Sequence, residues 1–323
     1  MKIVVTHALS DEGMKVLSDA GAEVFVAGSA EPMTYIDELM DADAFIIRVG
    51  LCPKDLISRL PKLKVIGRTG VGYDNVDVAF ASSQGIPVVY TPGANSRSVA
   101  EHTVALMFAL AKDLKNADEQ LRTGNWKVRD AGRSFELYGK KVGIIGTGAI
   151  GRIVAELCRG VGMRTAAFSH SHDRAKVEAA GCEYYEDLDD LLRDCDIITI
   201  HNPLTADTRN MISAREFSLM KNTALLINTS RGPIVNGQAL ADALNGGVIA
   251  GAAVDVYDHE PVPADDPVFT AKNLITTPHL AALTREARNR MSVRCAEGCI
   301  AVLKGKQWPD VVDKSVYENE RFQ

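Results

Sequence analysis

Short apolar runs rich in β-branched side chains recur through the first part of the chain, and stretches with helical spacing lie between them. Helical spacing covers Asp11–Ala20 and Tyr35–Met40. The apolar runs read "KIVVTH", "AEVFVAG", "AFIIRV", "KVIGRTG" and "IPVVYTP". Strands that alternate with helices form a parallel sheet with helices on both faces. We therefore predict an α/β unit that extends to about residue 95.

A long apolar segment separates this unit from a second one. Val99–Leu114 is apolar on nearly every side, which predicts a helix buried in a core or at an interface. Such a helix suits a domain junction or a dimer contact, and the sequence does not choose between them. Beyond it, strand-like runs resume as "KVGIIG", "RTAAFS", "DIITIH", "ALLINTS", "GAAVDVY" and "NLITTPH". They predict a second parallel sheet, followed by a helix that begins in "TREARNRM".

Composition narrows the class of protein. The 323 residues are 46% hydrophobic and 24% charged, which is ordinary for a globular protein. A formal net charge of −6 and the absence of a Lys/Arg-rich run argue against a nucleic-acid partner. No stretch approaches the roughly 20 apolar residues that cross a membrane, so we expect no membrane partner. The N-terminal apolar run is too short for a signal peptide.

The spacing of the cysteines bears on metal binding and on the compartment of the protein. The chain has six scattered cysteines and no CxxC pair. Cys295 and Cys299 are one helical turn apart, but no nearby His or Cys completes a set of metal ligands. We expect no metal site, reduced thiols and a cytoplasmic protein.

A glycine pattern marks the start of the second unit. Gly146, Gly148 and Gly151 form G-x-G-x-x-G, with Ala149 and Ile150 before the last glycine. The pattern follows the apolar run "KVGII" and opens a helical stretch, which is the context of a dinucleotide-binding turn. Its glycines allow a tight turn, close approach of the backbone to a pyrophosphate, and close packing of helix on strand. The helix N-terminus adds free N–H groups for the anion.

The next strand ends without the acid that usually follows it in such a site. That acid accepts hydrogen bonds from the ribose of NAD and repels the 2′-phosphate of NADP. Here the strand ends in Ser169, His170 and Ser171, whose hydroxyls and imidazole donate hydrogen bonds to a phosphate. Asp173, the nearest acid, comes later, and Arg174 adds a guanidinium. The sequence favours NADP(H) as cofactor, with NAD(H) as the alternative.

Three further polar residues follow predicted strands of the second unit. They are Arg231 in "INTSRGPIV", Glu260 in "AVDVYDHEPV" and His279 in "TTPHLAA". Ligands of an open α/β sheet bind outside the carboxyl ends of its strands. We therefore expect these three side chains to converge near the nicotinamide.

These segments belong to a longer set that resembles a known family. Together with "GRTGVGYDNVD", "GANSRSVAEHT" and "HNPLTADTRNMI", they resemble the D-isomer-specific 2-hydroxyacid dehydrogenases over essentially the whole chain. The segments "GRTGVGYDNVD" and "GANSRSVAEHT" are most similar to those of the D-3-phosphoglycerate dehydrogenases. Hydroxypyruvate reductases belong to the same family. The resemblance implies two doubly wound parallel-sheet domains, Rossmann-like or flavodoxin-like, with the active-site cleft between them. Residues 1–98 plus 285–323 would form the substrate domain, and residues 99–284 the dinucleotide-binding domain, on which a homodimer would be built.

The resemblance also implies roles for individual residues. Arg231 matches the family arginine that binds the substrate carboxylate and carbonyl, a task that suits a guanidinium fork. His279 matches the proton donor and acceptor, and Glu260 the acid paired with it. The resemblance matches Asn202, Thr229 and Ser230 to cofactor contacts. It matches Asp255 to a residue that contacts the nicotinamide carboxamide. Matches to substrate contacts are Arg48, Val71, Gly72 and Asn95.

The expected activity is reversible, NAD(P)-dependent reduction of a 2-keto acid to a D-2-hydroxy acid. Hydroxypyruvate, glyoxylate and 3-phosphohydroxypyruvate are the first candidate substrates. Val49 stands where phosphoglycerate dehydrogenases carry Ser, which weakens the phosphorylated candidate. The chain ends before the regulatory domain of longer relatives, so we expect no feedback by serine. The alternatives are an NAD(H)-sensing corepressor of the same fold and a formate dehydrogenase, which typically carries Gln in the position of Glu260.

Overall fold

The computed structural model describes residues 1–319, and their contacts divide the chain into two compact units. The first unit is Met1–Asn95 together with the chain from Leu283 onward, and the second is Ser96–Ala282. All strands in both units pair in parallel. The predicted fold class of two parallel-sheet α/β domains is therefore confirmed. The division falls a few residues from the predicted boundaries, and the roles of the two units as substrate and cofactor domains stay predictions.

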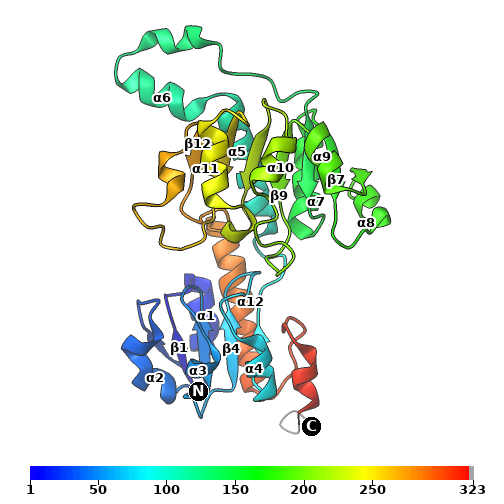
Figure 1. The fold of residues 1–323 in the computed structure, drawn as a ribbon. Helices are drawn as coiled ribbons and strands as arrows, with labels where there is room; N and C mark the ends of the chain where they lie inside the picture. Colours follow the sequence, from blue (N-terminus) through cyan, green and yellow to red (C-terminus); the bar gives the residue numbers. More distant parts are fainter. Residues whose placement is uncertain (320–323) are drawn as a thin grey trace. The chain divides into compact units, whose positions relative to one another are not determined.

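The first unit is built on a sheet with the strand order β2-β1-β3-β4-β5 (Figure 1). Its strands are β1 (Lys2–Val5), β2 (Glu23–Val26), β3 (Ala44–Ile47), β4 (Val65–Arg68) and β5 (Val88–Val89). Alternate side chains of β3 enter opposite cores, Phe45 and Ile47 on one face and Ala44 and Ile46 on the other. Burial on both faces explains why these strands read as continuous apolar runs in the sequence.

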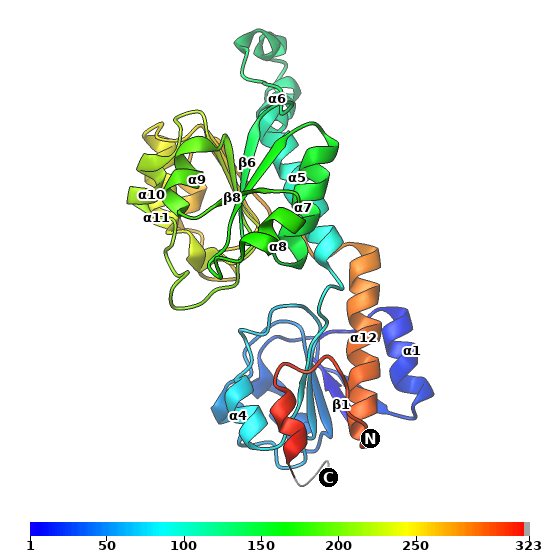
Figure 2. The same cartoon turned by 90° about the vertical axis from the view of Figure 1, so that its right-hand side faces the viewer.

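Helices cover both faces of this first sheet. On one face, α1 (Asp11–Asp19) and α12 (Arg285–Leu303) lie side by side (Figure 2). The other face is covered by α2 (Ile36–Met40), α3 (Lys54–Ile57) and α4 (Val78–Ser83). A Cβ added to Gly67 of β4 would lie 2.5 Å from the sulfur of Cys299 on α12, so a glycine is needed for this close packing. The last helix of the chain thus returns to the sheet formed by the first residues.

The second unit has the strand order β12-β11-β10-β9-β6-β7-β8. Its strands are β6 (Lys141–Ile145), β7 (Arg164–Phe168), β8 (Glu183–Tyr185), β9 (Ile197–Ile200), β10 (Leu225–Asn228), β11 (Gly251–Val254) and β12 (Leu274–Thr276). The strand that opens the unit, β6, lies between β7 and β9, so the order of winding reverses there. In open α/β sheets, the carboxyl ends of the strands beside such a reversal form the ligand site.

Two sets of helices enclose the second sheet. One core contains side chains of α5 (Ser96–Ala111), α7 (Ala149–Gly160) and α8 (Arg174–Ala179). The opposite core contains side chains of α9 (Leu188–Asp194), α10 (Ala214–Leu219) and α11 (Gly237–Asn245). The predicted apolar helix is α5, and it packs on α7 in the core. It ends before Asp113, whose left-handed backbone (φ 51°) separates it from α6 (Leu114–Arg122).

All six cysteines are free and buried. Within residues 1–319, no group of three or more His, Cys, Asp or Glu side chains is placed to hold a metal ion. Over the same residues, no helix has both the length and the apolar character needed to cross a membrane.

Candidate active site

The glycine turn after β6 has the geometry that its sequence predicts. Gly146 adopts φ 98°, and a Cβ there would lie 2.9 Å from the backbone nitrogen of Asn202. A Cβ on Gly151 would lie 2.0 Å from the carbonyl oxygen of Gly146, so only glycine lets α7 begin this close to the strand. Gly148 caps α7, and the position its Cβ would take is open. A bulky anion can therefore approach the backbone at Gly148.

Unsatisfied polar atoms lie at the same place. The hydroxyl of Thr147 and the side-chain oxygen of Asn202 are buried, and neither has a hydrogen-bond partner in the described chain. Buried polar groups in native proteins nearly always have partners, supplied by the protein, water or a ligand. Together with the N-terminus of the 12-residue helix α7, these atoms fit the phosphates and ribose of a dinucleotide.

The loop after β7 carries hydroxyls and an imidazole. The hydroxyls of Ser169 and Ser171 lie 2.9 Å apart, and the exposed ring of His170 packs edge-on against Phe168. The side chain of Asp173 accepts a hydrogen bond from the N–H of Lys176 and so caps α8. The nearest acid is thus used locally, and Ser169, His170 and Ser171 are the groups left at the end of the strand.

Arg174 does not join this polar loop. Its guanidinium stacks over the ring of Tyr184, 4.4 Å from the centroid, and lies 3.6 Å from the carboxylate of Glu178. Sequence spacing alone placed Arg174 among the possible phosphate ligands. In the structure, its charge is paired within and beside α8.

His279 and Glu260 form the hydrogen bond that the family resemblance implies. Nδ1 of His279 lies 2.6 Å from Oε2 of Glu260, and Oε1 of Glu260 accepts a bond from the backbone N–H of Tyr257. An ionised carboxylate only accepts hydrogen bonds, so Nδ1 of His279 carries a proton. That assignment leaves Nε2 of His279 to exchange a proton with a ligand.

Opposing effects act on the carboxyl of Glu260. Burial alone would raise its pKa, but the hydrogen bond and charge of His279 lower it, as do the N–H of Tyr257 and the charge of Arg231. The pKa of Glu260 therefore lies below its usual range. Glu260 stays ionised at neutral pH and keeps both oxygens as acceptors for His279 and Tyr257.

A buried carboxylate holds the turn that carries His279. Oδ1 of Asp255 accepts bonds from the hydroxyl of Thr277 (2.5 Å) and the N–H of Leu280 (2.9 Å), and Oδ2 accepts one from the N–H of Ala281 (2.9 Å). These donors lie on both sides of His279, whose backbone is left-handed (φ 48°). Asp255 was predicted as a cofactor contact, which stays a prediction; its contacts within the chain make it a support for the turn that carries His279.

His102 on α5 joins this network, although no sequence pattern singled it out. Its Nε2 lies 3.2 Å from the hydroxyl of Thr277 and 3.8 Å from Oδ1 of Asp255. Burial lowers the pKa of His102, and the nearby charge of Asp255 only partly opposes this. Because Thr277 donates to Asp255, the neutral His102 donates to Thr277. The only sequence signal was the segment "SVAEHT", which contains His102 but says nothing of its partners.

Arg231 follows β10 in a loop that packs against the Glu260 segment. A Cβ on the adjacent Gly232 would lie 2.0 Å from the backbone of Tyr257. The hydroxyl of Ser230 donates to the carbonyl of Asn202 (2.5 Å), which ties this loop to the loop after β9. The hydroxyl of Thr229 lies 2.9 Å from that of Thr103 on α5 and is buried. The second unit thus gathers the catalytic candidates at the carboxyl edge of its own sheet.

The predicted substrate contacts lie in the first unit. Arg48 directly follows β3, and Val71 and Gly72 follow β4; all three are partly buried. Asn95 is buried, and its side-chain oxygen has no partner in the described chain. These residues stand at the carboxyl side of the first sheet, and their contact with substrate stays a prediction.

Comparison with known proteins places these features in a family. The model of the D-isomer specific 2-hydroxyacid dehydrogenase, NAD binding domain, matches residues 104–281. A glyoxylate reductase of Aeropyrum pernix is 39% identical, covering 98% of this chain and 96% of its own. A D-3-phosphoglycerate dehydrogenase of Methanocaldococcus jannaschii is 39% identical over the whole chain, which spans 61% of that relative's length.

A solved structure shows the same likeness. An NADPH-dependent glyoxylate/hydroxypyruvate reductase from Sinorhizobium meliloti, crystallised with citrate, is 28% identical and superimposes with a TM-score of 0.82. The alignment covers 96% of this chain and 97% of the reductase. The NAD-binding family model spans the glycine turn, the Arg231 loop and the His279 turn of the second unit. On this evidence, the chain belongs to the D-isomer specific 2-hydroxyacid dehydrogenase family.

Proposed function

We propose that the protein catalyses reversible reduction of a 2-keto acid to a D-2-hydroxy acid. The observation that carries this proposal is the His279–Glu260 hydrogen bond, which leaves Nε2 of His279 as a proton donor in the unit that binds the cofactor. The charge of Arg231 acts on Glu260, so the substrate anchor and the proton donor belong to one site. Relatives named as glyoxylate reductase and D-3-phosphoglycerate dehydrogenase support this reaction class.

The protein's own groups account for the proton and for the substrate's charge. When bound, the reduced cofactor supplies a hydride to the carbonyl carbon of the substrate. Arg231 binds the carboxylate, which a guanidinium meets through two parallel hydrogen bonds. Nε2 of His279 gives its proton to the carbonyl oxygen, and Glu260 keeps the ring oriented through Nδ1. In the direction of oxidation, His279 takes the proton back.

We further propose a substrate-binding role for the first unit and a cytoplasmic location for the protein. Arg48, Val71, Gly72 and Asn95 contact the substrate, with the backbone of Val71 and Gly72 donating N–H groups to its carboxylate. The first unit acts as substrate domain and the second as cofactor domain. The protein works in the cytoplasm, where its six free, buried thiols stay reduced.

NADPH is the preferred cofactor in this proposal. The side chains of Ser169, His170 and Ser171 carry no negative charge, and the nearest acid is engaged as a helix cap. Hydroxyls and an imidazole at the end of β7 donate to a 2′-phosphate without repelling it.

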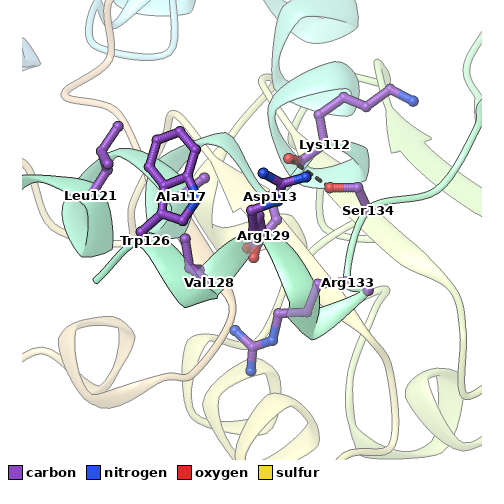
Figure 3. A pocket seen from close by; sticks show the side chains of 10 residues that line it. Lys112, Asp113, Ala117, Leu121, Trp126, Val128, Arg129, Arg133 and Ser134 are labelled. Atoms are coloured by element: carbon purple, nitrogen blue, oxygen red, sulfur yellow. Dashed lines mark hydrogen bonds between the residues drawn. The ribbon is translucent and has the colours of Figure 1, made fainter. Parts of the chain in front are cut away.

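The protein also forms a homodimer, and the segment Leu114–Ser134, here called the arm, supports this. No residue of α6 is buried, although a nine-residue helix in water is marginal without packing. Leu114, Leu121 and Trp126 are all more than half exposed. Figure 3 shows Leu121 and Trp126 beside a pocket lined by the arm together with Lys112 and Asp113. A second copy of the chain covers these apolar side chains.

The first prediction concerns catalysis. His279→Asn and Arg231→Gln are each expected to lower kcat/KM for hydroxypyruvate by about 10²- to 10⁴-fold, because each removes a group that acts on the reacting atoms. Binding of NADPH, followed by fluorescence titration, is expected to change little. His259→Asn, an exposed histidine next to Glu260, serves as the control and keeps its activity. Near-normal activity of either catalytic variant would show that the roles are wrongly assigned.

The second prediction concerns cofactor choice. Ser169→Asp places a carboxylate at the end of β7, which repels a 2′-phosphate and accepts bonds from a free ribose. The ratio of kcat/KM with NADPH to that with NADH is expected to exceed one in the original protein and to fall at least tenfold in the variant. Ser218→Asp, on the exposed face of α10, is the charge-matched control. A ratio below one in the original protein would contradict the proposed preference.

The third prediction concerns the dimer. Sedimentation equilibrium is expected to give twice the chain mass of 34.9 kDa. Trp126→Asp combined with Leu121→Asp places charges in the apolar contact, and the mass is expected to fall to that of one chain. Phe269→Asp, which changes an aromatic side chain outside the arm that is also more than half exposed, leaves the dimer intact. A dimer that survives the double change would exclude the arm as the interface.

A further inference from the structure

Two polar side chains of α5 contact the His279 turn, which runs from Thr277 to Ala281. The hydroxyl of Ser98 donates to the carbonyl oxygen of Ala281 (2.6 Å), at the end of the turn. Nε2 of His102 lies 3.2 Å from the hydroxyl of Thr277, at its start. Ser98 and His102 are four residues apart, so they lie on one face of the helix, about one turn from each other. One helix face thus contacts both ends of the turn.

The hydrogen bond between His102 and Thr277 has a defined direction. A hydroxyl has one proton, and that of Thr277 goes to the carboxylate of Asp255 (2.5 Å). Thr277 therefore accepts from Nε2 of His102. Asp255 in turn accepts the backbone N–H groups of Leu280 and Ala281. A single chain of hydrogen bonds thus leads from α5 through the buried carboxylate to the backbone of the turn.

Both contacts of α5 are shielded from water. Ser98 and Ala281 are each less than one-tenth exposed, and the side chain of His102 is 18% exposed. Hydrogen bonds are stronger in such surroundings than in water, and an unsatisfied partner there costs more. The helix is itself anchored, because the fully buried side chain of Met107 packs in the core between α5 and α7. The turn is therefore tied to a rigid element of the second unit.

We propose that Ser98 and His102, here called the clamp, are positioning residues that hold the His279 turn so that Nε2 of His279 meets the carbonyl oxygen of the substrate. The inference rests on the proposed function, in which His279 donates the proton. Asp255 binds the turn from the sheet, and the clamp binds it from the helix. A misplacement of about 1 Å in a reacting group costs about 10²-fold in rate. The clamp therefore acts on the rate of the chemical step through the position of His279.

The test compares substitutions that remove a hydrogen bond of the clamp with one that keeps it. His102→Leu removes the donor to Thr277, whereas His102→Gln keeps an N–H donor. Single-turnover reduction of hydroxypyruvate, followed by the absorbance of NADPH, is expected to be about tenfold slower in His102→Leu. Ser98→Ala is expected to slow it as well, and His102→Gln to keep most of the original rate. KM for hydroxypyruvate is expected to stay within about threefold in all three variants.

Two controls distinguish positioning from a general loss of stability. Met107→Ala opens a cavity in the core beside the same helix, so it is expected to lower the melting temperature and to keep the single-turnover rate. His102→Leu added to His279→Asn is expected to cause no further loss, because the clamp acts through His279. A rate that falls equally in Met107→Ala, or a full further loss in the double variant, overturns the inference.

Hydrogen exchange tests the clamp without any reaction. The amide protons of Leu280 and Ala281, which bond to Asp255, are expected to exchange about tenfold faster in His102→Leu and at the original rate in His102→Gln. If the original protein reduces 2-keto acids and His102→Leu changes neither exchange nor rate, the inference is overturned and the proposed function stands. Faster exchange with an unchanged rate shows that the clamp only stabilises the turn, which also overturns the positioning role. An original protein that reduces no 2-keto acid overturns the proposed function and this role together.

Discussion

The buried carboxylate of Asp255 fixes the turn on which His279 lies. A charge in a protein interior is tolerated only when hydrogen bonds replace its hydration, and Asp255 accepts bonds from Thr277, Leu280 and Ala281. The three donors bracket His279 and hold it in a backbone conformation that few residues other than glycine adopt. The orientation of the imidazole toward Glu260 follows from this constraint.

The parallel sheet explains why so many of the candidate site residues lie at one edge of the second unit. Every strand of that sheet points the same way, so the loops after β6, β9, β10, β11 and β12 emerge at one edge. The glycine turn, Asn202, the Arg231 loop and Asp255 belong to these loops. Hydrogen bonds between them, such as that from Ser230 to the carbonyl of Asn202, join segments far apart in the sequence. The loops that carry the candidate cofactor and catalytic residues therefore meet at one edge of the sheet.

The sequence predicted those features that depend on local pattern. Continuous apolar runs located most strands, because a strand buried on both faces must be apolar throughout. The glycine turn was predictable because its spacing reflects close approaches that a Cβ would prevent. The family resemblance supplied the pairing of His279 with Glu260, which lie on different loops. The short edge strand β8 was not predicted, since its run "EYY" is brief and only half-buried.

Other features could not be predicted because they depend on tertiary contacts. Nothing in "SVAEHT" shows that His102 reaches Thr277, since the two residues meet only when α5 packs against the end of β12. The pairing of Arg174 with Tyr184 and Glu178 likewise depends on how α8 lies beside β8.

The proposed mechanism requires that Glu260 hold His279 through Nδ1, so that Nε2 donates the proton in the reduction. The most direct test is kcat/KM for hydroxypyruvate reduction in the original protein and in Glu260→Gln. The two carboxylate oxygens of Glu260 accept hydrogen bonds from Nδ1 of His279 and from the N–H of Tyr257, and an amide has only one oxygen to accept them. General acid catalysis contributes about 10²- to 10⁴-fold, so we expect kcat/KM to fall about tenfold or more in Glu260→Gln, with NADPH binding unchanged. A kcat/KM equal to that of the original protein would contradict the proposed role of Glu260.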